Sequence, residues 1–228
     1  MGKNKLARFA ENETFEHVVQ PTFEELVQGR FSLRGKWNGR IFEREAPIVL
    51  ELGCGGGEYT TGLAALRPEK NYLGVDIKGA RLWRGARTAK EQGLNNVAFL
   101  RTHVDHLLYC FAPQEASEIW LTFSDPQLKK SKARKRLTSP FFLARYKEIL
   151  APGGVVHLKT DSPVLYNYTL EQIAAHKLPI HEQSADVYAD LVHRVSPEEQ
   201  AVLNIRTYYE SMWLEEGRTI HYVRFGIR

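Results

Sequence analysis

Short apolar runs alternate with longer amphipathic segments along the chain from Pro47 onward. The apolar runs are rich in β-branched and large side chains, which is typical of buried strands. They predict strands at residues 48–52, 71–75, 97–100, 118–123 and 155–159. The apolar spacing of the segments between them predicts helices at residues 59–66, 81–92 and 139–150. Strands that alternate with crossover helices build a parallel, doubly wound α/β sheet with helices on both faces.

The two ends of the chain depart from this rhythm. Residues 1–45 mix basic, acidic and aromatic side chains without a regular period, so we interpret them as an N-terminal extension of a main domain at residues 46–228. Near the other end, Ser196 is followed by Pro197 and by Glu199 three residues after the cap, which predicts the beginning of a helix. Residues 219–225 alternate enough to predict a closing strand, antiparallel at an edge of the sheet.

Composition narrows the class of protein. The chain has 228 residues, of which 43% are hydrophobic and 25% charged, as in a soluble globular domain. Cys54 and Cys110 are far apart in sequence, and no Cys or His pair has zinc-ligand spacing, so we expect no metal and no disulfide framework. Because no apolar stretch is long enough to span a membrane or to form a signal peptide, we expect a cytoplasmic protein without membrane contact. The oligomeric state stays open between a monomer and a homodimer.

A glycine-rich turn follows the first predicted strand. Residues 51–57 place Gly53 and Gly55 where the absence of a Cβ lets a ligand approach the backbone. The dinucleotide fingerprint G-x-G-x-x-G fails here, because Glu58 or Thr60 occupies the position of its last glycine. The pattern E-x-G-x-G-x-G, which begins at Glu51, resembles the first motif of class I S-adenosylmethionine methyltransferases. That resemblance implies S-adenosylmethionine as the cofactor.

Carboxylates near this turn suit a cofactor that carries a sulfonium and an amino group rather than a diphosphate. We expect Glu51 to hold the methionine amino group, directly or through water. Asp76 ends the next predicted strand, where folds of this kind bind a ribose, and we expect it to accept hydrogen bonds from the ribose hydroxyls. The alternative is that both carboxylates only cap helices.

Two groups of basic residues stand out, although the net charge is only +4. Six of the eight residues from Lys129 to Arg136 are Lys or Arg, just after Asp125 and Pro126 at the end of the fourth predicted strand. Such a cluster attracts phosphates, and a merely solvated loop is the alternative. A second series recurs every third residue, at Lys78, Arg81, Arg84, Arg87 and Lys90. Because steps of three drift around a helix, we interpret this series as a solvated helix surface.

Residues 124–137 resemble the signature of the tRNA (guanine-N7-)-methyltransferases, whose usual form is D-P-W-P-K-K-R-H-x-K-R-R-L. The matching residues are Asp125, Pro126, Lys129, Lys130, Lys135, Arg136 and Leu137. The sequence departs from the signature at Gln127 and Leu128, where the family usually has Trp and Pro, and at Ser131 and Lys132, where it usually has Arg and His. Two later segments, residues 159–161 and 207–210, resemble the T-D and T-x-x-E motifs of the same family.

This resemblance implies a Rossmann-like, mostly parallel sheet of seven strands. It also implies methyl transfer from S-adenosylmethionine to N7 of guanine 46 in the variable loop of tRNA. Asp125 is the first choice for the residue that contacts the cofactor and stabilises charge on the guanine, and Asp161 is the second. The implied substrate-binding residues are Lys129, Asp161, Thr207 and Glu210. Thr207 and Glu210 would complete the base pocket or orient Lys129.

The remaining implied contacts concern the RNA and the adenine of the cofactor. The residues expected to bind RNA phosphates are Lys130, Lys132, Arg134, Lys135 and Arg136. The family has an Asp or Asn on the adenine side, where this sequence has His103. His103 is expected to bond the adenine edge, Asp105 takes its place if the register shifts, and a surface histidine without a role is the alternative. Two other functions stay open: a methyltransferase for a protein or small molecule, and a non-catalytic RNA-binding accessory subunit that keeps the methyltransferase fold.

Overall fold

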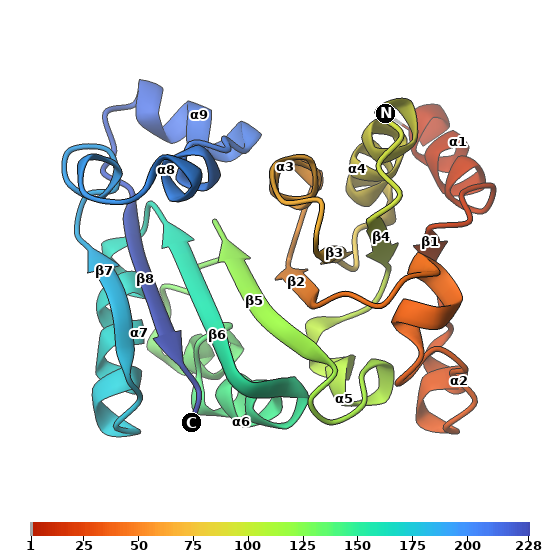
Figure 1. Ribbon diagram of the computed structural model, residues 1–228, viewed down its shortest axis with the longest axis horizontal. Helices are drawn as coiled ribbons and strands as arrows, with labels where there is room; N and C mark the ends of the chain where they lie inside the picture. The colour runs from red at the N-terminus through yellow and green to blue at the C-terminus, as the bar shows by residue number, and fades with distance from the viewer. Residues whose placement is uncertain (1) are drawn as a thin grey trace.

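A twisted sheet with helices on both faces forms the body of the molecule in the computed structural model, which describes residues 2–228 (Figure 1). In these residues the sheet has eight strands in the order β1-β4-β3-β2-β5-β6-β8-β7. The strands are β1 (Val18–Val19), β2 (Ile48–Leu52), β3 (Asn71–Val75), β4 (Val97–Leu100), β5 (Ala116–Thr122), β6 (Leu150–Thr160), β7 (Ile180–Ser184) and β8 (His221–Gly226). The main helices are α1 (Gly2–Asn12), α2 (Phe23–Val27), α3 (Glu58–Leu66), α4 (Gly79–Glu91), α5 (Leu107–Cys110), α6 (Pro140–Ile149), α7 (Pro163–Ala175), α8 (Pro197–Leu203) and α9 (Tyr208–Glu215).

The predicted strands and crossover helices are confirmed, and most of their bounds agree within two residues. β2, β3 and β4 begin and end where the apolar runs do, whereas β6 begins earlier than predicted because an irregular pairing with β5 extends it back to Leu150. β8 is antiparallel, as predicted, but it does not lie at the edge, because β7 pairs with its outer side. β7 was not predicted, because most of its side chains are polar and exposed, as is common on an edge strand. The eighth strand, β1, comes from the N-terminal extension and pairs in parallel with β4.

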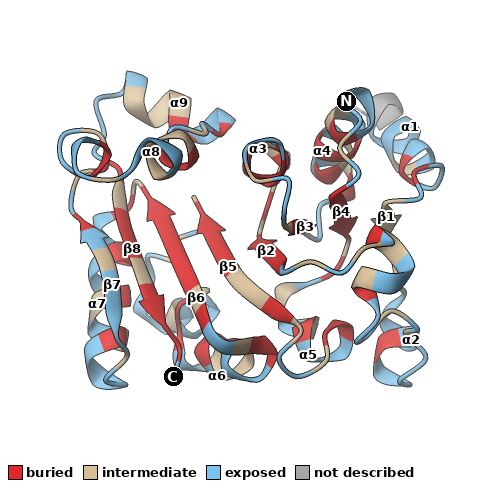
Figure 2. Cartoon of the chain, viewed as in Figure 1, coloured by how far each residue is buried: buried red, intermediate tan, exposed pale blue. Residues whose placement is uncertain are grey.

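Each face of the sheet buries its own set of side chains. In β2, Ile48, Leu50 and Leu52 belong to a core that also contains side chains of α5, α6 and α7, whereas Val49 belongs to a second core with α3, α4 and α8. Figure 2 shows that the central strands are buried along most of their length. This two-sided burial explains why the strands read as continuous apolar runs instead of an alternating pattern.

The chain order places a crevice at one end of the sheet. From β2 the chain winds outward through β3 and β4, then returns through α5 to β5, which pairs with the other side of β2. The strand order therefore reverses between β2 and β5. In open α/β sheets, ligands bind outside the carboxyl ends of the strands at such a point. α3 and α4 lie on one side of this end of the sheet, and α8 and α9 on the other (Figure 1).

The N-terminal extension is packed against the main domain. Asn12 Nδ2 donates a hydrogen bond to the carbonyl of Gly79 at 2.9 Å, and Trp83 Nε1 donates one to Glu11 Oε2 at 2.7 Å. These contacts fix α1 against α4. In the described part of the chain, no helix combines the length and the apolar character needed to cross a lipid bilayer.

Candidate active site

A cleft of ≈ 760 Å³ opens where β2, β3, β5 and β6 end. Seven of the residues predicted to bind the cofactor, the guanine or the RNA line it, and they come from segments far apart in the chain. These are Gly53, Gly55, Asp76, Asp125, Lys135, Asp161 and Thr207. The structure therefore brings the glycine turn and three carboxylates from neighbouring strand ends into one concave site.

The glycine turn exposes its backbone to this cleft. Gly53, Gly55 and Gly57 have φ values of +79°, +56° and +74°, a region that residues with a Cβ rarely adopt. A Cβ on Gly55 would meet nothing within 4 Å, so that part of the turn has open space beside it. A Cβ on Gly57 would come within 2.8 Å of the Phe99 ring. Gly57 thus serves the packing of the turn on the sheet, whereas Gly55 leaves room for a ligand.

Asp76 clamps the same turn from the neighbouring strand. Its Oδ2 accepts a hydrogen bond from the Gly55 N–H at 3.0 Å, and its Oδ1 accepts one from the Lys78 N–H at 2.7 Å. A carboxylate has about four acceptor positions, so two remain for donors in the cleft. The side chain is half-buried and lines the cleft, as a ribose-binding residue must.

Glu51 lies beneath the turn and does not line the cleft. It is 2% exposed and accepts hydrogen bonds from the backbone N–H of Thr60 at 2.8 Å and from the hydroxyls of Thr60 and Thr122. Burial raises the pKa of Glu51 to about 7, against the lowering effect of those hydrogen bonds. In this arrangement Glu51 ties β2 to α3 and to β5, and it supports the turn from below.

Asp125 lies at the end of β5 in a tight loop. Its Oδ1 accepts a hydrogen bond from the backbone N–H of Gln127 at 2.9 Å, while the carboxylate is exposed in the cleft. The loop bends sharply, since Phe123 and Gln127 have φ values of +51° and +47°. Oδ2 has no hydrogen-bond partner among the described residues, which leaves it available to a ligand.

Arg136 has different surroundings from those expected of a phosphate-binding residue. It is 6% exposed, and its guanidinium donates to the carbonyls of Pro126 at 3.0 Å and Gln127 at 3.1 Å. The same group lies 4.4 Å from the centre of the Tyr168 ring. Arg136 therefore fixes the loop that carries Asp125. Sequence reasoning could not distinguish it from its basic neighbours, because only the fold determines which of them points inward.

The rest of the basic run is at the surface. The exposed members are Lys129, Lys130, Lys132, Arg134 and Lys135, most of them in a 3₁₀ segment at Lys130–Lys135. Lys135 lines the cleft, whereas the other four lie outside its lining. The run therefore forms a basic surface beside the site, with one residue reaching into it.

The T-D motif supplies a third carboxylate, at the end of the strand next to β5. Asp161 follows β6, lines the cleft and forms an ion pair with Arg218, with 2.9 Å between the Arg218 guanidinium and Asp161 Oδ2. Arg218 in turn lies over the Trp213 ring at 3.7 Å. Neither Arg218 nor Trp213 was assigned a role from the sequence, since nothing local connects them to Asp161.

Glu210 of the T-x-x-E motif is buried and does not reach the cleft. It is 0% exposed, forms an ion pair with Lys159 Nζ at 2.7 Å and accepts a hydrogen bond from the Tyr188 hydroxyl at 2.7 Å. Burial lowers the pKa of Lys159, and the Glu210 carboxylate opposes that shift. Thr207, three residues earlier, caps α9 by accepting a hydrogen bond from the Glu210 N–H at 3.1 Å. Threonine followed three residues later by glutamate is a helix-start signal, so the sequence could have revealed this structural role.

His103 and Asp105 both lie away from the cleft lining. Each is exposed, and the His103 ring is 5.6 Å from that of His106. Their order in the sequence suited an adenine contact, but the described cleft does not include either side chain. Which of the two reaches an adenine stays a prediction.

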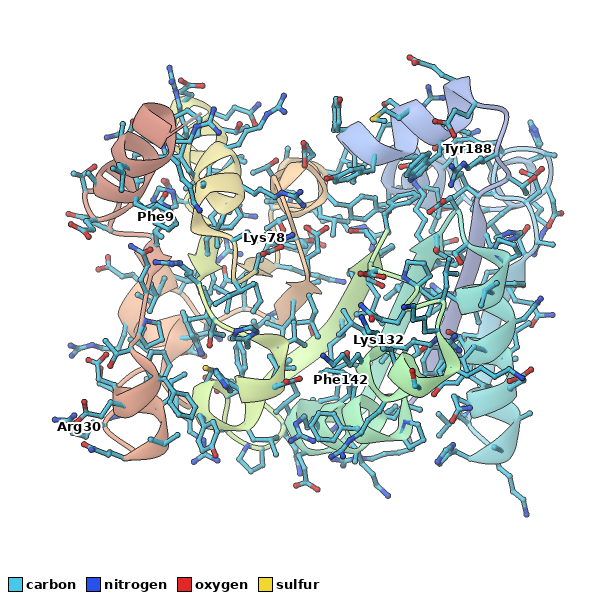
Figure 3. All side chains as sticks on the ribbon, turned by 180° about the vertical axis from the view of Figure 1, so that it is seen from behind. Phe9, Arg30, Lys78, Lys132, Phe142 and Tyr188 are labelled. Carbon is cyan, nitrogen blue, oxygen red and sulfur yellow. The ribbon has the colours of Figure 1, made fainter. Side chains whose placement is uncertain are left out.

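The second basic series is exposed, as expected of a solvated helix surface, but its first three members also line the cleft. Lys78, Arg81 and Arg84 line the cleft from α4, and Arg8 joins them from α1. We call these four residues the α1–α4 basic flank. In Figure 3, Lys78 lies beside α4 and Lys132 on the segment after β5, on opposite sides of β5 in that view.

The matches with known proteins agree with this geometry. Residues 45–223 match the protein family described as "Putative methyltransferase". The chain is 51% identical to the tRNA (guanine-N(7)-)-methyltransferase of Christiangramia forsetii over 226 residues, which cover 99% of both chains. It is 47% identical to the protein of the same name from Bacteroides thetaiotaomicron over 228 residues, 100% of this chain and 87% of that one. The chain belongs to the tRNA (guanine-N7-)-methyltransferase family.

A more distant relative agrees with this family, and two solved structures share the fold. A tRNA (guanine-N(7)-)-methyltransferase of Streptococcus suis is still 35% identical over 190 residues, 83% of this chain and 85% of that one. A solved antibiotic-related methyltransferase superposes with a TM-score of 0.59 at 14% identity, over 92% of this chain and 96% of that chain. The 16S rRNA methyltransferase KamB also gives 0.59 at 14% identity, over 82% and 90%. The sheet is thus that of class I methyltransferases.

Two departures from the usual motif of the tRNA (guanine-N7-)-methyltransferase family fall on the Asp125 loop. Gln127 stands where Trp is usual, and its N–H holds Asp125 Oδ1. Leu128 stands where Pro is usual and is 67% exposed. Both departures therefore leave the carboxylate in place. No group of His, Cys, Asp and Glu side chains within the described residues is arranged to hold a metal ion.

Proposed function

We propose that this chain transfers a methyl group from S-adenosylmethionine to N7 of guanine 46 in the variable loop of tRNA. The observation that carries the proposal is the single cleft that joins the glycine turn, Asp76, Asp125 and Asp161, with a basic surface beside it. Membership of the family supports the reaction class. The basic surface favours an RNA substrate over a small molecule.

The cleft fits the cofactor on two counts. The open space beside Gly55 accommodates a ligand against the backbone, and Asp76 keeps free acceptor positions for hydroxyl donors. When bound, S-adenosylmethionine supplies an electrophilic methyl group on a positively charged sulfur. The glycine turn and Asp76 would hold it, and Glu51 would contribute from below by fixing the turn between Thr60 and Thr122.

Guanine N7 has a lone pair and no proton, so its methylation requires no general base. The residues of the site must instead align the base and stabilise the positive charge that develops on it. Asp125 is the better placed carboxylate, because its Oδ2 is free while Asp161 is engaged by Arg218. We therefore assign Asp125 to the guanine, where it would also accept hydrogen bonds from N1–H and the exocyclic amine.

The target base must leave its stack to reach this cleft, since side chains do not reach N7 in a deep, narrow A-form major groove. Tyr208 is 60% exposed and lines the cleft, and Tyr209 beside it is also exposed. Exposed aromatic rings offer faces on which an unstacked base can lie. Lys135 and the exposed lysines before it would hold the neighbouring phosphates.

The test is methylation of defined tRNA transcripts by the purified full-length protein with S-adenosylmethionine. We expect 7-methylguanine at position 46, and none in a matched transcript with 7-deazaguanine there, because carbon replaces N7 in that base. Asp125→Asn keeps an acceptor for the Gln127 N–H but loses the negative charge. It should lower kcat by a factor on the order of 100, as loss of a charge-stabilising group does, while calorimetry still detects binding of S-adenosylhomocysteine.

Three outcomes would contradict this assignment. Failure of the wild-type protein to bind S-adenosylhomocysteine, with intact tRNA binding, would favour the RNA-binding accessory subunit. Methylation of a small molecule or protein, with no affinity for tRNA at low salt, would favour the other alternative. Methylation at a different guanine would keep the reaction and reject the position.

A further inference from the structure

The cleft has cations on the side opposite the basic run. The α1–α4 basic flank consists of Arg8, Lys78, Arg81 and Arg84, all exposed and all part of the cleft lining. Successive α-helical positions are about 100° apart around the helix axis, so a step of three residues falls about 60° short of a full turn. Lys78 is the N-cap residue of α4, and Arg81 and Arg84 stay within about 60° of each other on the helix, whereas Arg87 and Lys90 lie outside the cleft lining.

These cations have little carboxylate compensation. Among the residues whose side chains are described, no carboxylate lies within 4.0 Å of the charged group of Arg8, Lys78 or Arg81, and Arg84 has Glu58 at 3.8 Å with its own side chain 65% exposed. Arg87, on the same helix, is paired with Glu91 at 2.7 Å. Unpaired cations on one wall of a cleft raise the local concentration of anions.

The N-terminal extension supplies the fourth member of the flank. α1 is fixed to α4 through the bonds of Glu11 to Trp83 and of Asn12 to Gly79, and Arg8 lies 4.6 Å from the centre of the Trp83 ring. This packing holds the Arg8 side chain beside the α4 cations. The extension thus takes part in the site and not only in the edge of the sheet.

The cleft carries charges of both signs. The strand ends carry Asp76, Asp125 and Asp161, whereas cations stand on both sides, with Lys135 on one and the α1–α4 basic flank on the other. Carboxylates repel phosphates and accept hydrogen bonds from a base, whereas cations attract phosphates. The target base of an RNA strand would therefore enter the cleft between the carboxylates. The backbone of the strand would lie on the two basic sides.

Resting on the proposed function, we infer that the α1–α4 basic flank is a second phosphate-binding surface. It binds the RNA backbone on one side of the target guanine, while the Lys129–Lys135 surface binds it on the other. The strand crosses the cleft between them. Arg81 of this flank lies 5.8 Å from the ring centre of Tyr209, so the flank reaches the aromatic residues on the far side of the site.

The experiment compares Lys78→Met/Arg81→Met with Arg87→Met in the full-length protein. Arg87 is a matched control, because it is an exposed arginine of the same helix outside the cleft lining. The readout is the Kd for unmodified tRNA between 50 and 200 mM KCl, together with calorimetry of S-adenosylhomocysteine. Each phosphate contact contributes about 0.7 to 0.9 to the slope of log Kd against log salt. The double variant should therefore lose about 1.4 to 1.8 of that slope and bind tRNA on the order of 10-fold more weakly at the lowest salt.

Arg8→Met should by itself lower the slope by nearly one, and Arg87→Met should leave the slope and the Kd unchanged. Affinity for S-adenosylhomocysteine should stay within about twofold in every variant, since the flank is assigned to RNA. An unchanged slope in the double variant would overturn the inference, and so would weaker cofactor binding with unchanged tRNA binding. These readouts do not depend on turnover, so failure of the wild-type protein to methylate tRNA would reject the proposed function separately.

Discussion

The two sides of the cleft use their charged residues differently. One side, which we call the motif flank, consists of residues 124–137 and α9, and it contains two of the recognisable sequence motifs, the basic signature and T-x-x-E. Two of its motif residues, Arg136 and Glu210, are buried and bind other parts of the protein. The α1–α4 basic flank has no motif, yet Arg8 and Arg81 are exposed and free of carboxylates within salt-bridge distance among the described side chains.

This difference shows that a sequence motif contains residues needed for packing as well as residues needed for chemistry. In a dense charged segment, the side chains that point inward need partners within the protein, because burying a charge without a partner costs free energy of folding. A sparse series of charged residues on a regular helix can place several cations on one exposed side, where they need no partner within the protein. We therefore expect substitutions of the buried charged residues Arg136 and Glu210 on the motif flank to change stability, and substitutions on the α1–α4 basic flank to change RNA binding alone.

The largest effect should come from Glu210→Gln. This change leaves the Lys159 ammonium buried without its counter-charge, and such a loss typically costs about 3–5 kcal/mol of unfolding free energy. Urea denaturation measures it. Glu215→Gln is the control, because Glu215 is an exposed glutamate of the same helix. If both variants lose the same small amount, the motif flank is not stabilised by the buried pair.

Glu51 lies beneath the glycine turn, where it binds Thr60 of α3 and Thr122 of β5. Its folded pKa of about 7 lies above the ordinary value of 4.5, so the folded state is penalised as pH rises from 4.5 to 7 and fully so above 7. At about 1.4 kcal/mol per unit, the penalty is on the order of 3 kcal/mol. Glu51→Gln should therefore gain stability relative to the wild-type protein at pH 8 and little at pH 4.5. Thermal unfolding at both pH values tests this, and an equal change at both would reject the raised pKa.

Arg136→Met should cost less, about 1–3 kcal/mol, because two loop carbonyls lose their charged donor. Since that loop carries Asp125, kcat should fall as well. The matched change Lys132→Met, at an exposed position of the same run, should stay within about 0.5 kcal/mol of the wild-type stability. Denaturation measures the change in stability, and single-turnover kinetics measure the change in rate. Equal stability of the two variants would place Arg136 among the surface cations.

Tyr208→Ala should leave stability nearly unchanged and weaken tRNA binding by about 1–3 kcal/mol, the usual contribution of base stacking on an aromatic ring. Tyr208→Phe keeps the ring and should bind tRNA as the wild-type protein does. The KM for tRNA, measured in the two variants, shows whether the ring or the hydroxyl contributes to binding. A loss in the phenylalanine variant as large as in the alanine variant would assign the effect to the hydroxyl.

The smallest effect should come from Lys130→Met on the exposed surface of the motif flank. We expect unchanged stability and a salt slope for tRNA binding lower by nearly one, as for loss of a single phosphate contact. Filter binding at several salt concentrations measures it. A slope equal to that of the wild-type protein would mean that Lys130 does not contact the RNA.

The sequence by itself determined the strands, the turn and the carboxylates at the strand ends. β2, β3 and β4 were predictable because an apolar run buried on both faces is a local pattern. Asp76, Asp125 and Asp161 followed from it, since the carboxyl ends of parallel strands meet at one edge of a sheet.

Only the tertiary structure decided which charged residues face the cleft. Arg136 and Lys135 are neighbours in one basic run, yet one is buried under the Asp125 loop and the other lines the site. Glu210 meets Lys159 across 51 residues of chain, and Arg8 reaches the cleft through α1. The direction of a side chain depends on what packs against its backbone, and that neighbour is usually distant in sequence.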